Sequence, residues 1–397
     1  MTDQQTGNIA VPMGRFDYID QKSVLFGQPM AQAVAGFCAE RGEARVLVVA
    51  ARSLSKNTDA ITILTDALGQ TALGVFDEVE AHAPIPSALV LAEQVRDAKP
   101  DRIVVVGGGS AIDTTKAALV AVMRDAKTID EVVAQAERGR AARGDTSAHP
   151  VPPCRTLTVP TTLSGAEFGV IGGTVDPRSK IKEMMRAPWL CAEAVVYDPG
   201  LSLHTLEWLW LSTGIRAVDH AVETVLSPDT NAYTDSLALA GLYRLGKGLR
   251  GVKADPSDLA ARLDCQFGVW LASVGIGRVR YGASHGIGHQ LGAVGDVPHG
   301  HTSCVLLPAV MRFNASVIGD RFPSLAHALG RSDNDAPRAV ADLISELGQP
   351  TTLGDVGIED SQFGEIAETS MQNPFVQANP RPITVPEDIM RILWDAA

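Results

Sequence analysis

Residues 281–303, with the sequence YGASHGIGHQLGAVGDVPHGHTS, contain four of the nine histidines of the chain. These are His285, His289, His299 and His301. A histidine side chain has a pKa near neutral pH, and its neutral ring is a frequent metal ligand. The cluster therefore predicts a divalent-metal site or acid–base chemistry, and simple packing is the remaining interpretation.

The spacing of these histidines predicts a helix that presents two imidazoles on one face. His285 and His289 are four residues apart, which is close to one helical turn. Gly286 and Gly288 disfavour a helix by propensity, so close packing or a ligand must support it. His299 follows in the segment DVPHGH, which we expect to be a loop.

A second helical segment, GIRAVDHAVET at residues 214–224, carries another histidine. Arg216 and His220 are four residues apart and share a face, whereas Asp219 is rotated by about 100° in an ideal helix. Together, His220, His285 and His299 could form a divalent-metal site of three imidazoles.

A run of glycines joins a buried strand to a helix in the segment VVVGGGSAIDTTKA. Its turn consists of Gly107, Gly108, Gly109 and Ser110. Glycines let a ligand approach the backbone, and the start of the next helix offers unpaired N–H groups to a phosphate. The turn lacks the G-x-G-x-x-G and G-K-[ST] patterns, so phosphate binding and a tight ligand-free turn both remain open.

A second turn of small polar residues, PTTLSGAE at residues 160–167, follows another apolar strand. It offers Thr161, Thr162 and Ser164 as hydroxyl donors, although an ordinary polar turn would have the same composition.

Strands and helices alternate along the first half of the chain. Apolar runs predict strands within residues 44–54, 71–79, 101–110, 154–162 and 191–199, and helices are predicted near 57–68, 86–100 and 111–124. Residues 124–150 are expected to form a helix and an exposed loop. This alternation predicts a doubly wound α/β domain. Helical periodicity dominates afterwards, so we expect two domains, 1–198 and 199–397, the second all-helical.

Composition excludes several classes of protein. The net charge of −12 argues against general nucleic-acid binding, which needs basic surfaces. No apolar run reaches the length of a membrane span, and the N-terminus lacks the pattern of a signal peptide. The five cysteines are odd in number and lack C-x-x-C spacing, which fits free thiols in the cytoplasm.

Five motifs together resemble the group III, or iron-containing, alcohol dehydrogenases, in particular their maleylacetate-reductase-like branch. The motifs are GGGSAIDTTK, PTTLSGAE, GIRAVDHAVE, HGIGHQLGAVGDVPHG and NPRPIT, and the resemblance extends from about residue 24 to the end of the chain. It implies an N-terminal dinucleotide-binding domain and a C-terminal helical domain, with the active site in the cleft between them.

The resemblance also implies a role for individual positions on the cofactor side. The turn from Gly107 to Ser110 corresponds to the pyrophosphate-binding turn. Thr161, Thr162 and Leu163 correspond to a segment that lines the cofactor, and Lys182 corresponds to a lysine on the cofactor side.

On the substrate side, His220, His285 and His299 fall on three metal-ligand positions of the family. His289 falls on the histidine beside the nicotinamide, which relatives are thought to use in proton relay, and we expect it to be the general acid. His82, in EAHAP, matches a His-x-Pro pattern of maleylacetate reductases, with no role assigned.

The chain departs from the metal-dependent branch at the fourth ligand position, where the pattern Asp-x-x-x-His has Arg216 in place of the aspartate. A guanidinium cannot ligate a metal, and a cation about 5 Å from a divalent ion would be repelled by several kcal/mol. We therefore expect no tightly bound iron or zinc, unless a distorted helix turns Asp219 inward. Arg216 could instead bind a substrate carboxylate or polarise a carbonyl, and a structural pair with Glu223 or Asp219 is the alternative.

The resemblance, together with these positions, implies an NAD(P)H-dependent reductase of an unsaturated or keto carboxylic acid, and the resemblance alone implies a role in aromatic catabolism. His220, His285 and His299 would then be hydrogen-bond donors around the substrate oxygen. The alternatives are a metal-dependent alcohol dehydrogenase acting on aldehydes or ketones and a nucleotide-binding module without catalysis.

The cofactor and the assembly are also predicted from these patterns. Relatives specific for NAD have an aspartate after the first strand, where this chain has Ala51, followed by Arg52 and Ser53. Because this chain has no carboxylate at that position to repel a 2′-phosphate, we expect NADPH to be tolerated alongside NADH. A homodimer is expected because such dehydrogenases are often dimers.

Overall fold

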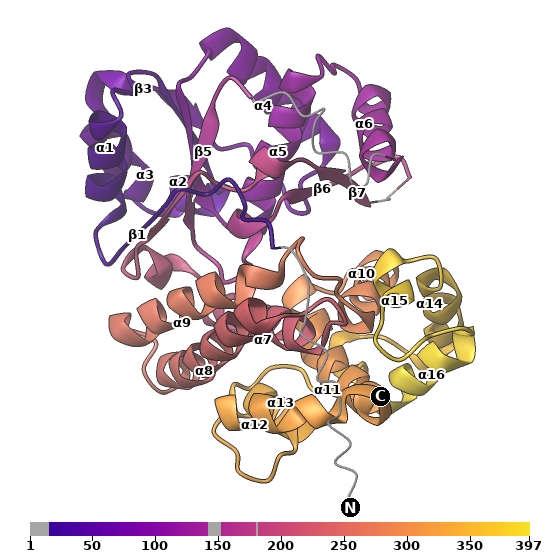
Figure 1. Ribbon diagram of the computed structural model, residues 1–397. Coiled ribbons are helices and arrows are strands. Elements are labelled where there is room, and N and C mark those ends of the chain that lie inside the picture. The colour runs from indigo at the N-terminus through magenta and orange to yellow at the C-terminus, as the bar shows by residue number, and fades with distance from the viewer. Residues whose placement is uncertain (1–15, 142–151, 180–181) are drawn as a thin grey trace, which may run out of the picture.

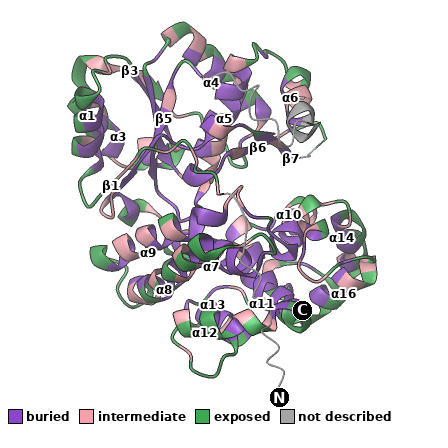
Figure 2. Cartoon of the chain, in the orientation of Figure 1, coloured by how far each residue is buried: buried purple, intermediate pink, exposed green. Residues whose placement is uncertain are grey.

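The computed structural model describes residues 16–141, 152–179 and 182–397 of the chain. An α/β half is followed by a helical half, and Figure 1 shows them as an upper and a lower layer. In Figure 2 the buried residues lie along the central strands and along the helices at the middle of the helical half.

Six parallel strands form the central sheet. Their order is β1-β8-β5-β4-β2-β3, and their bounds are Ser23–Phe26 for β1, Val46–Ala50 for β2, Ala72–Phe76 for β3, Arg102–Gly107 for β4, Arg155–Pro160 for β5 and Ala194–Tyr197 for β8. Every residue of β2 and β4 is buried, as expected for strands covered on both faces. The five predicted strands are confirmed, whereas the four-residue strand β1 was not predicted.

Helices cover both faces of this sheet. They are α1 (Met30–Glu40), α2 (Arg52–Asn57), α3 (Ala60–Leu68), α4 (Ile85–Ala98), α5 (Gly109–Met123) and α6 (Ile129–Ala141). Alternate residues of β2 pack on opposite faces of the sheet. Leu47 packs with α4 and α5, whereas Val46 and Val48 pack with α1 and α3. The predicted doubly wound arrangement is therefore confirmed. The loop expected before residue 150 lies largely outside the described residues.

A two-stranded antiparallel hairpin lies beside α5, formed by β6 (Ile171–Val175) and β7 (Lys182–Arg186). The buried Lys116 of α5 anchors it, because its Nζ donates hydrogen bonds of 2.7 to 2.9 Å to the carbonyl groups of Ala166, Gly169 and Ile171. The hairpin was not predicted, and it carries Lys182.

From Pro199 onward, the described residues form helices and connecting segments only. The helices are α7 (Glu207–Leu226), α8 (Ala232–Ala254), α9 (Leu259–Ala272), α10 (Ala283–Gly295), α11 (His299–Ile318), α12 (Phe322–Ala328), α13 (Ala336–Glu346), α14 (Phe363–Ser370), α15 (Pro374–Gln377) and α16 (Pro386–Asp395). The exact boundary at residue 198 stays a prediction.

One stretch, His299–Ala328, is long and apolar enough to cross a membrane by length and composition. Of its most apolar window, 67% is buried inside the protein, which is typical of a core helix. The predicted absence of a membrane span is consistent with this burial and remains a prediction.

Candidate active site

Helix α7 presents a stripe of four functional side chains toward α10 and α11. Arg216, Asp219, His220 and Glu223 are spaced by three, four and seven residues, which places them on one side of a regular helix. The helix is continuous from Glu207 to Leu226. Asp219 therefore faces the site without the helix distortion that we expected to be necessary.

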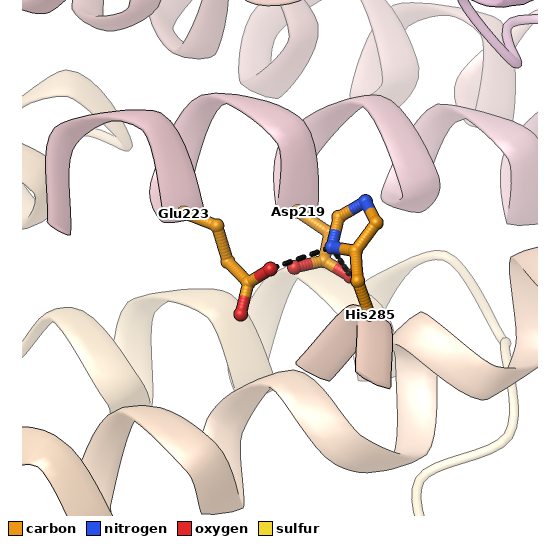
Figure 3. A group of neighbouring side chains, drawn as sticks. All are labelled: Asp219, Glu223 and His285. Carbon is orange, nitrogen blue, oxygen red and sulfur yellow. Dashed lines mark hydrogen bonds and ion pairs between the residues drawn. The ribbon is translucent and has the colours of Figure 1, made fainter. Parts of the chain in front are cut away.

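Glu223 holds the start of α10 and one of its histidines. Its Oε2 accepts hydrogen bonds from the backbone N–H of Gly282 at 3.0 Å and lies 2.6 Å from Nδ1 of His285. Its Oε1 accepts the backbone N–H of Ser284 at 3.1 Å. Figure 3 shows the second ring nitrogen of His285 pointing away from both carboxylates. That nitrogen, Nε2, is buried and has no hydrogen-bond partner among the described residues.

Asp219 ties three helices together and pairs with Arg216. Its Oδ2 accepts hydrogen bonds from the hydroxyls of Ser284 on α10 at 2.9 Å and Ser303 on α11 at 2.7 Å. Nη1 of Arg216 lies 3.5 Å from the same oxygen and donates to the Ser303 hydroxyl at 3.0 Å. The structural pair of Arg216 with Asp219 is thus present, and it fixes the guanidinium in place.

Close packing supports the glycine-rich helix α10. A Cβ atom on Gly286 would lie 2.8 Å from the backbone nitrogen of Val376 in α15. A Cβ atom on Gly288 would lie 3.0 Å from Oγ1 of Thr302 in α11. The glycines lower the helix propensity of α10, but they also let α11 and α15 approach it closely. This packing sets the positions of His285 and His289.

His289 lies one turn after His285, at the contact of α10 with α15. Its Nδ1 is 3.3 Å from Nδ2 of Asn373, and its ring centroid is 5.4 Å from that of Phe375. The ring of His299 lies 6.3 Å away. Asn373 was not identified from the sequence, because only an Asn-Pro pair typical of a helix start marks it.

His299 joins the two halves of the protein. It is the first residue of α11 and not part of a loop, as the sequence had suggested. Its Nε2 lies 3.2 Å from Nζ of Lys182, on strand β7 of the α/β half. The ring of His82 lies 6.5 Å from that of His299, and Nε2 of His82 lies 3.7 Å from a carboxylate oxygen of Asp296. His82 therefore also lies where the two halves meet.

His220 and His301 differ in their surroundings. The His220 ring is buried and stacks against both Tyr281, at 5.7 Å, and His285, at 5.1 Å, whose rings lie 4.5 Å from each other. Its Nδ1 has no hydrogen-bond partner within the described ranges. His301 instead packs against Trp208 at 5.5 Å, near the start of α7, on the side of α11 that faces away from this stack.

The glycine turn follows the carboxyl end of β4, next to the segment that follows β5. Gly107 pairs with Pro160 in the parallel register, and its carbonyl accepts the backbone N–H of Thr161 at 3.1 Å. A Cβ atom on Gly108 would lie 2.8 Å from Cγ2 of Thr162. Gly109 and Ser110 open the long helix α5. The predicted cofactor-binding turns are therefore adjacent, at the edge of the sheet where nucleotides bind in such folds.

Leu163 links this edge to the helical half. Its backbone N–H donates to the hydroxyl of Thr213 on α7 at 3.1 Å, while its side chain is buried in the core of the helical half. Its predicted contact with the cofactor can therefore involve the backbone, because the side chain is occupied with packing.

Burial and two nearby cations together lower the pKa of the site histidines. Burial, together with the charges of Arg216 and Lys182, holds the pKa of His289 well below its usual value. The Lys182 ammonium, followed by burial, does the same for the pKa of His299. Burial and Arg216 lower the pKa of His285 to about 3. These imidazoles are therefore neutral at neutral pH.

The buried acids shift in the opposite direction. Burial raises the pKa of Glu223 to about 7, although backbone N–H bonds from Gly282 and Ser284 favour its ionised form. Burial also raises the pKa of Asp219, against the effect of the nearby His285 and Arg216. In both carboxyl groups, burial therefore outweighs the hydrogen-bond donors and positive charges that favour the ionised form.

The side chains at the family's metal positions do not fit a tightly bound divalent ion. In residues 16–141, 152–179 and 182–397, the potential ligand atoms that lie within 4.8 Å of one another belong to Asp219, Glu223 and His285, and not to the three imidazoles. The 2.6 Å contact between His285 and Glu223 leaves no room for an ion between them. Arg216 lies against Asp219, and Lys182 against His299, so a cation stands at either end of the site.

The site residues therefore form three connected groups. Arg216, Asp219, Glu223 and two histidines, His220 and His285, form a buried network. His289, His299 and Lys182 lie together where the halves meet, and the glycine turn with Thr161 and Thr162 lies at the sheet edge. The charge of Arg216 lowers the pKa of His285 in the first group and of His289 and His299 in the second. These two groups therefore share one electrostatic environment.

Comparisons with known proteins agree with this arrangement. The family model described as iron-containing alcohol dehydrogenase matches residues 21–199, and that of the C-terminal part of the Fe-containing alcohol dehydrogenase family matches residues 210–397. Dehydrogenase FUM7 of Gibberella moniliformis is 33% identical over 94% of this chain and 96% of its own length. Maleylacetate reductase 1 of Rhodococcus opacus is 31% identical over 94% of both chains.

Solved structures give the same result. Maleylacetate reductase from Agrobacterium tumefaciens superposes with a TM-score of 0.80 at 28% identity, covering 97% of this chain and 98% of its own. A 1,3-propanediol oxidoreductase superposes with a TM-score of 0.86 at 26% identity, covering 97% of this chain and 100% of its own. This chain belongs to the iron-containing alcohol dehydrogenase family, and it is an NAD(P)-dependent oxidoreductase that resembles the maleylacetate reductases.

Proposed function

We propose that this enzyme reduces an unsaturated or keto carboxylic acid with NADH or NADPH and uses no catalytic metal. The observation that carries the proposal is the position of Arg216, a fixed cation at the site where metal-dependent relatives are expected to have an aspartate. The resemblance to maleylacetate reductases supports an acidic substrate of the maleylacetate class.

Arg216 is suited to bind an anion. Its Nη1 is committed to Ser303 and Asp219, and its side chain is 13% exposed. Because a guanidinium carries five N–H donors, this pairing leaves donors for a substrate carboxylate or a developing enolate. Asp219 holds the group in a single position, so little reorganisation is needed when charge develops on the substrate.

The proposed reaction is a hydride transfer from C4 of the nicotinamide to a substrate carbon. Gly107, Gly108, Gly109 and Ser110 would bind the pyrophosphate, and Thr161, Thr162, Leu163 and Lys182 would line the cofactor. The electron pair displaced by the hydride moves onto the substrate oxygen, where Arg216 would stabilise it. His289 is the proposed contact with the reacting oxygen, and His220, His285 and His299 would complete the polar surroundings of the substrate.

For the cofactor, we infer tolerance of both NADH and NADPH. Ala51 follows β2 and lies against the glycine turn, since a Cβ atom on Gly107 would be 3.1 Å from that of Ala51. Arg52 and Ser53 come next and are exposed. A 2′-phosphate there would meet a cation and no carboxylate. Michaelis constants for both cofactors test this, and strict use of NADH with no NADPH turnover would reject it.

The proposed substrate class is tested by a screen in which metal content is measured on the same sample. Oxidation of NADH and NADPH would be followed with maleylacetate, other unsaturated and keto acids, and neutral aldehydes of similar size. We expect turnover of the acids by protein that contains far less than one metal per chain. Turnover confined to neutral aldehydes, together with stoichiometric metal, would contradict the proposal.

The second candidate is a metal-dependent alcohol dehydrogenase. It is favoured by two buried ring nitrogens, Nδ1 of His220 and Nε2 of His285, that lack partners in the described part of the chain. Chelator treatment separates the candidates: activity that is lost with the metal and returns on addition of Fe²⁺ or Zn²⁺ supports this alternative, and activity that persists supports the reductase.

We also propose a homodimer. Strand β1 is one of the two edge strands of the sheet, and the side chain of Phe26 at its end is half exposed. An open edge with an exposed aromatic is suited to association with a second copy. Light scattering after size exclusion should give twice the chain mass of 41.9 kDa, and a single-chain mass would reject the dimer.

A further inference from the structure

The neighbours of Asn373 determine the orientation of its side-chain amide. Asn373 is the N-cap of α15, and its Oδ1 accepts the backbone N–H of Phe375 at 3.0 Å. Its Nδ2 donates to the carbonyl oxygen of Gly286 on α10 at 3.2 Å. Because a backbone N–H can only donate and a carbonyl can only accept, the amide nitrogen must be the atom that faces α10.

The same amide nitrogen lies 3.3 Å from Nδ1 of His289. An amide NH₂ has hydrogens to donate and no lone pair to accept, so Nδ1 must provide the lone pair. A neutral imidazole with a bare Nδ1 carries its hydrogen on Nε2. We propose that Asn373 is a positioning residue that holds His289 as the neutral Nε2–H tautomer, so that His289 is a hydrogen-bond donor to the substrate oxygen.

This tautomer changes what His289 contributes to the reaction. A general acid would have to be an imidazolium, whose Nδ1–H would point at the hydrogens of the Asn373 amide. The two cations Arg216 and Lys182 also oppose that second proton. A neutral ring instead donates a hydrogen bond from Nε2 and keeps its hydrogen throughout the step, as an oxyanion-stabilising group does.

The reaction then balances with water as the source of the proton. The hydride leaves C4 of the reduced nicotinamide and bonds to the substrate carbon, which oxidises the cofactor to NAD(P)⁺. The displaced electron pair becomes an enolate or alkoxide, stabilised by His289 Nε2–H and Arg216. A water molecule then protonates the enolate or alkoxide, and the hydroxide that it leaves takes up a proton from the bulk solvent, so that the overall reaction consumes one hydride and one proton. This inference rests on the proposed function, because it requires negative charge to develop on a substrate oxygen.

The tautomer itself can be measured without any substrate. Protein labelled with ¹⁵N-histidine would be examined by long-range ¹H–¹⁵N correlation, and the His289 signals identified by their loss in His289→Gln. We expect Nδ1 of His289 in the unprotonated range and Nε2 in the protonated range at pH 7 to 8. A hydrogen found on Nδ1 would overturn the proposal, whichever substrate the enzyme uses.

Two variants separate tautomer control from helix capping, since serine and aspartate can both cap α15. In Asn373→Asp, a carboxylate would replace the amide donor and draw the hydrogen of His289 to Nδ1. Losing one oxyanion donor should lower kcat at pH 8 by about 10²- to 10³-fold, with recovery at lower pH as the carboxylate or the imidazole takes up a proton. Asn373→Ser removes the amide donor and places a shorter hydroxyl there without a negative charge, so a smaller loss of kcat is expected.

The matched control is Asn231→Asp, at the N-cap of α8, where the side chain accepts from Tyr233 and Thr234. It should leave kcat and its pH profile unchanged. Thermal melts would show that all three variants remain folded. An Asn373→Asp enzyme with the kcat and pH profile of the original protein would overturn the role assigned to Asn373. Loss of kcat without any change in the His289 tautomer would overturn it equally.

Discussion

Replacement of Arg216 by alanine is the sharpest test of an acidic substrate. The guanidinium contacts the Ser303 hydroxyl at 3.0 Å and lies 3.5 Å from Asp219. In the variant, Asp219 keeps its hydrogen bonds from Ser284 and Ser303, so the contact between α7, α10 and α11 is retained. The variant should therefore lose substrate binding, and it should also lose some stability because the buried Asp219 no longer has its cationic partner.

The size of the effect follows from the bonds that would be lost. A hydrogen bond to a charged group contributes about 1.5 to 3 kcal/mol. With a side chain that is 13% exposed, solvent screening is limited, and we take about 2.5 kcal/mol for a carboxylate held by Arg216. At about 1.4 kcal/mol per tenfold change, kcat/KM for an acid should fall by about 60-fold. A neutral aldehyde has no carboxylate to lose, so its KM should change by less than about threefold.

The assay is steady-state oxidation of NADH with one keto or unsaturated acid and one neutral aldehyde of similar size. Arg216→Lys should be intermediate, because lysine keeps the charge but loses the forked geometry. Arg312→Ala is the matched control, since Arg312 makes an exposed ion pair with Asp395 on the same half of the protein. Equal changes for the acid and the aldehyde in Arg216→Ala would refute the assignment of Arg216 to a substrate carboxylate.

Three further predictions concern His289 and the glycine turn. His289→Ala should lower kcat by about 10²-fold while the Kd for NADH stays nearly constant, as measured by fluorescence titration; an unchanged kcat would exclude contact with the reacting atoms. Between pH 6.5 and 5.5, the free energy of unfolding should fall by about 1 kcal/mol more in the original protein than in His289→Gln. The reason is that His289 binds a proton in the unfolded chain but not in the folded protein, where its pKa is lowered. If denaturant titrations give both proteins the same change with pH, His289 is not held neutral. Gly108→Ala should weaken cofactor binding by about tenfold, since its Cβ would lie 2.8 Å from Thr162. Gly36→Ala is the control and should not change the Kd, because its Cβ would meet no atom within 4 Å. Equal Kd values for both variants would argue against a cofactor at the turn.

The sheet was predictable because its strands are short apolar runs bounded by charge or turn residues. The run VLVVA of β2 and the run RIVVVG of β4 are buried along their whole length, which only a doubly covered sheet accounts for. The hairpin of β6 and β7 was missed because IGGTV is rich in glycine and KEMMR is charged. The hairpin is held by Lys116, which lies 55 residues before Ile171 at the start of its first strand, and sequence patterns do not report such contacts.

From the sequence, the positions of site residues could be predicted only where they share one helix, because regular spacing then shows which side chains lie on the same face. Four-residue spacing brought His285 and His289 to one face, and the motif that follows located His299. The hydrogen bond of Glu223 to His285 spans 62 residues and that of Asn373 to His289 spans 84, so neither pairing leaves a local pattern. Asp219 was expected to need a distorted helix, although three- and four-residue spacing from Arg216 and Glu223 already places it on the same stripe.

The charges of the site are consistent with an anionic substrate rather than a metal cation. Arg216 and Lys182 both lower the pKa of His289 and His299, so the imidazoles bring no positive charge of their own. A divalent ion would be repelled by Arg216, which is paired with Asp219, and by Lys182, whose charged form is favoured by the nearby Asp113. A carboxylate substrate would be attracted by both cations and would also receive hydrogen bonds from neutral rings that have hydrogens to donate. The cations that would oppose a divalent ion are therefore the same groups that would attract the proposed substrate, and arginine in place of aspartate at position 216 would contribute to both properties.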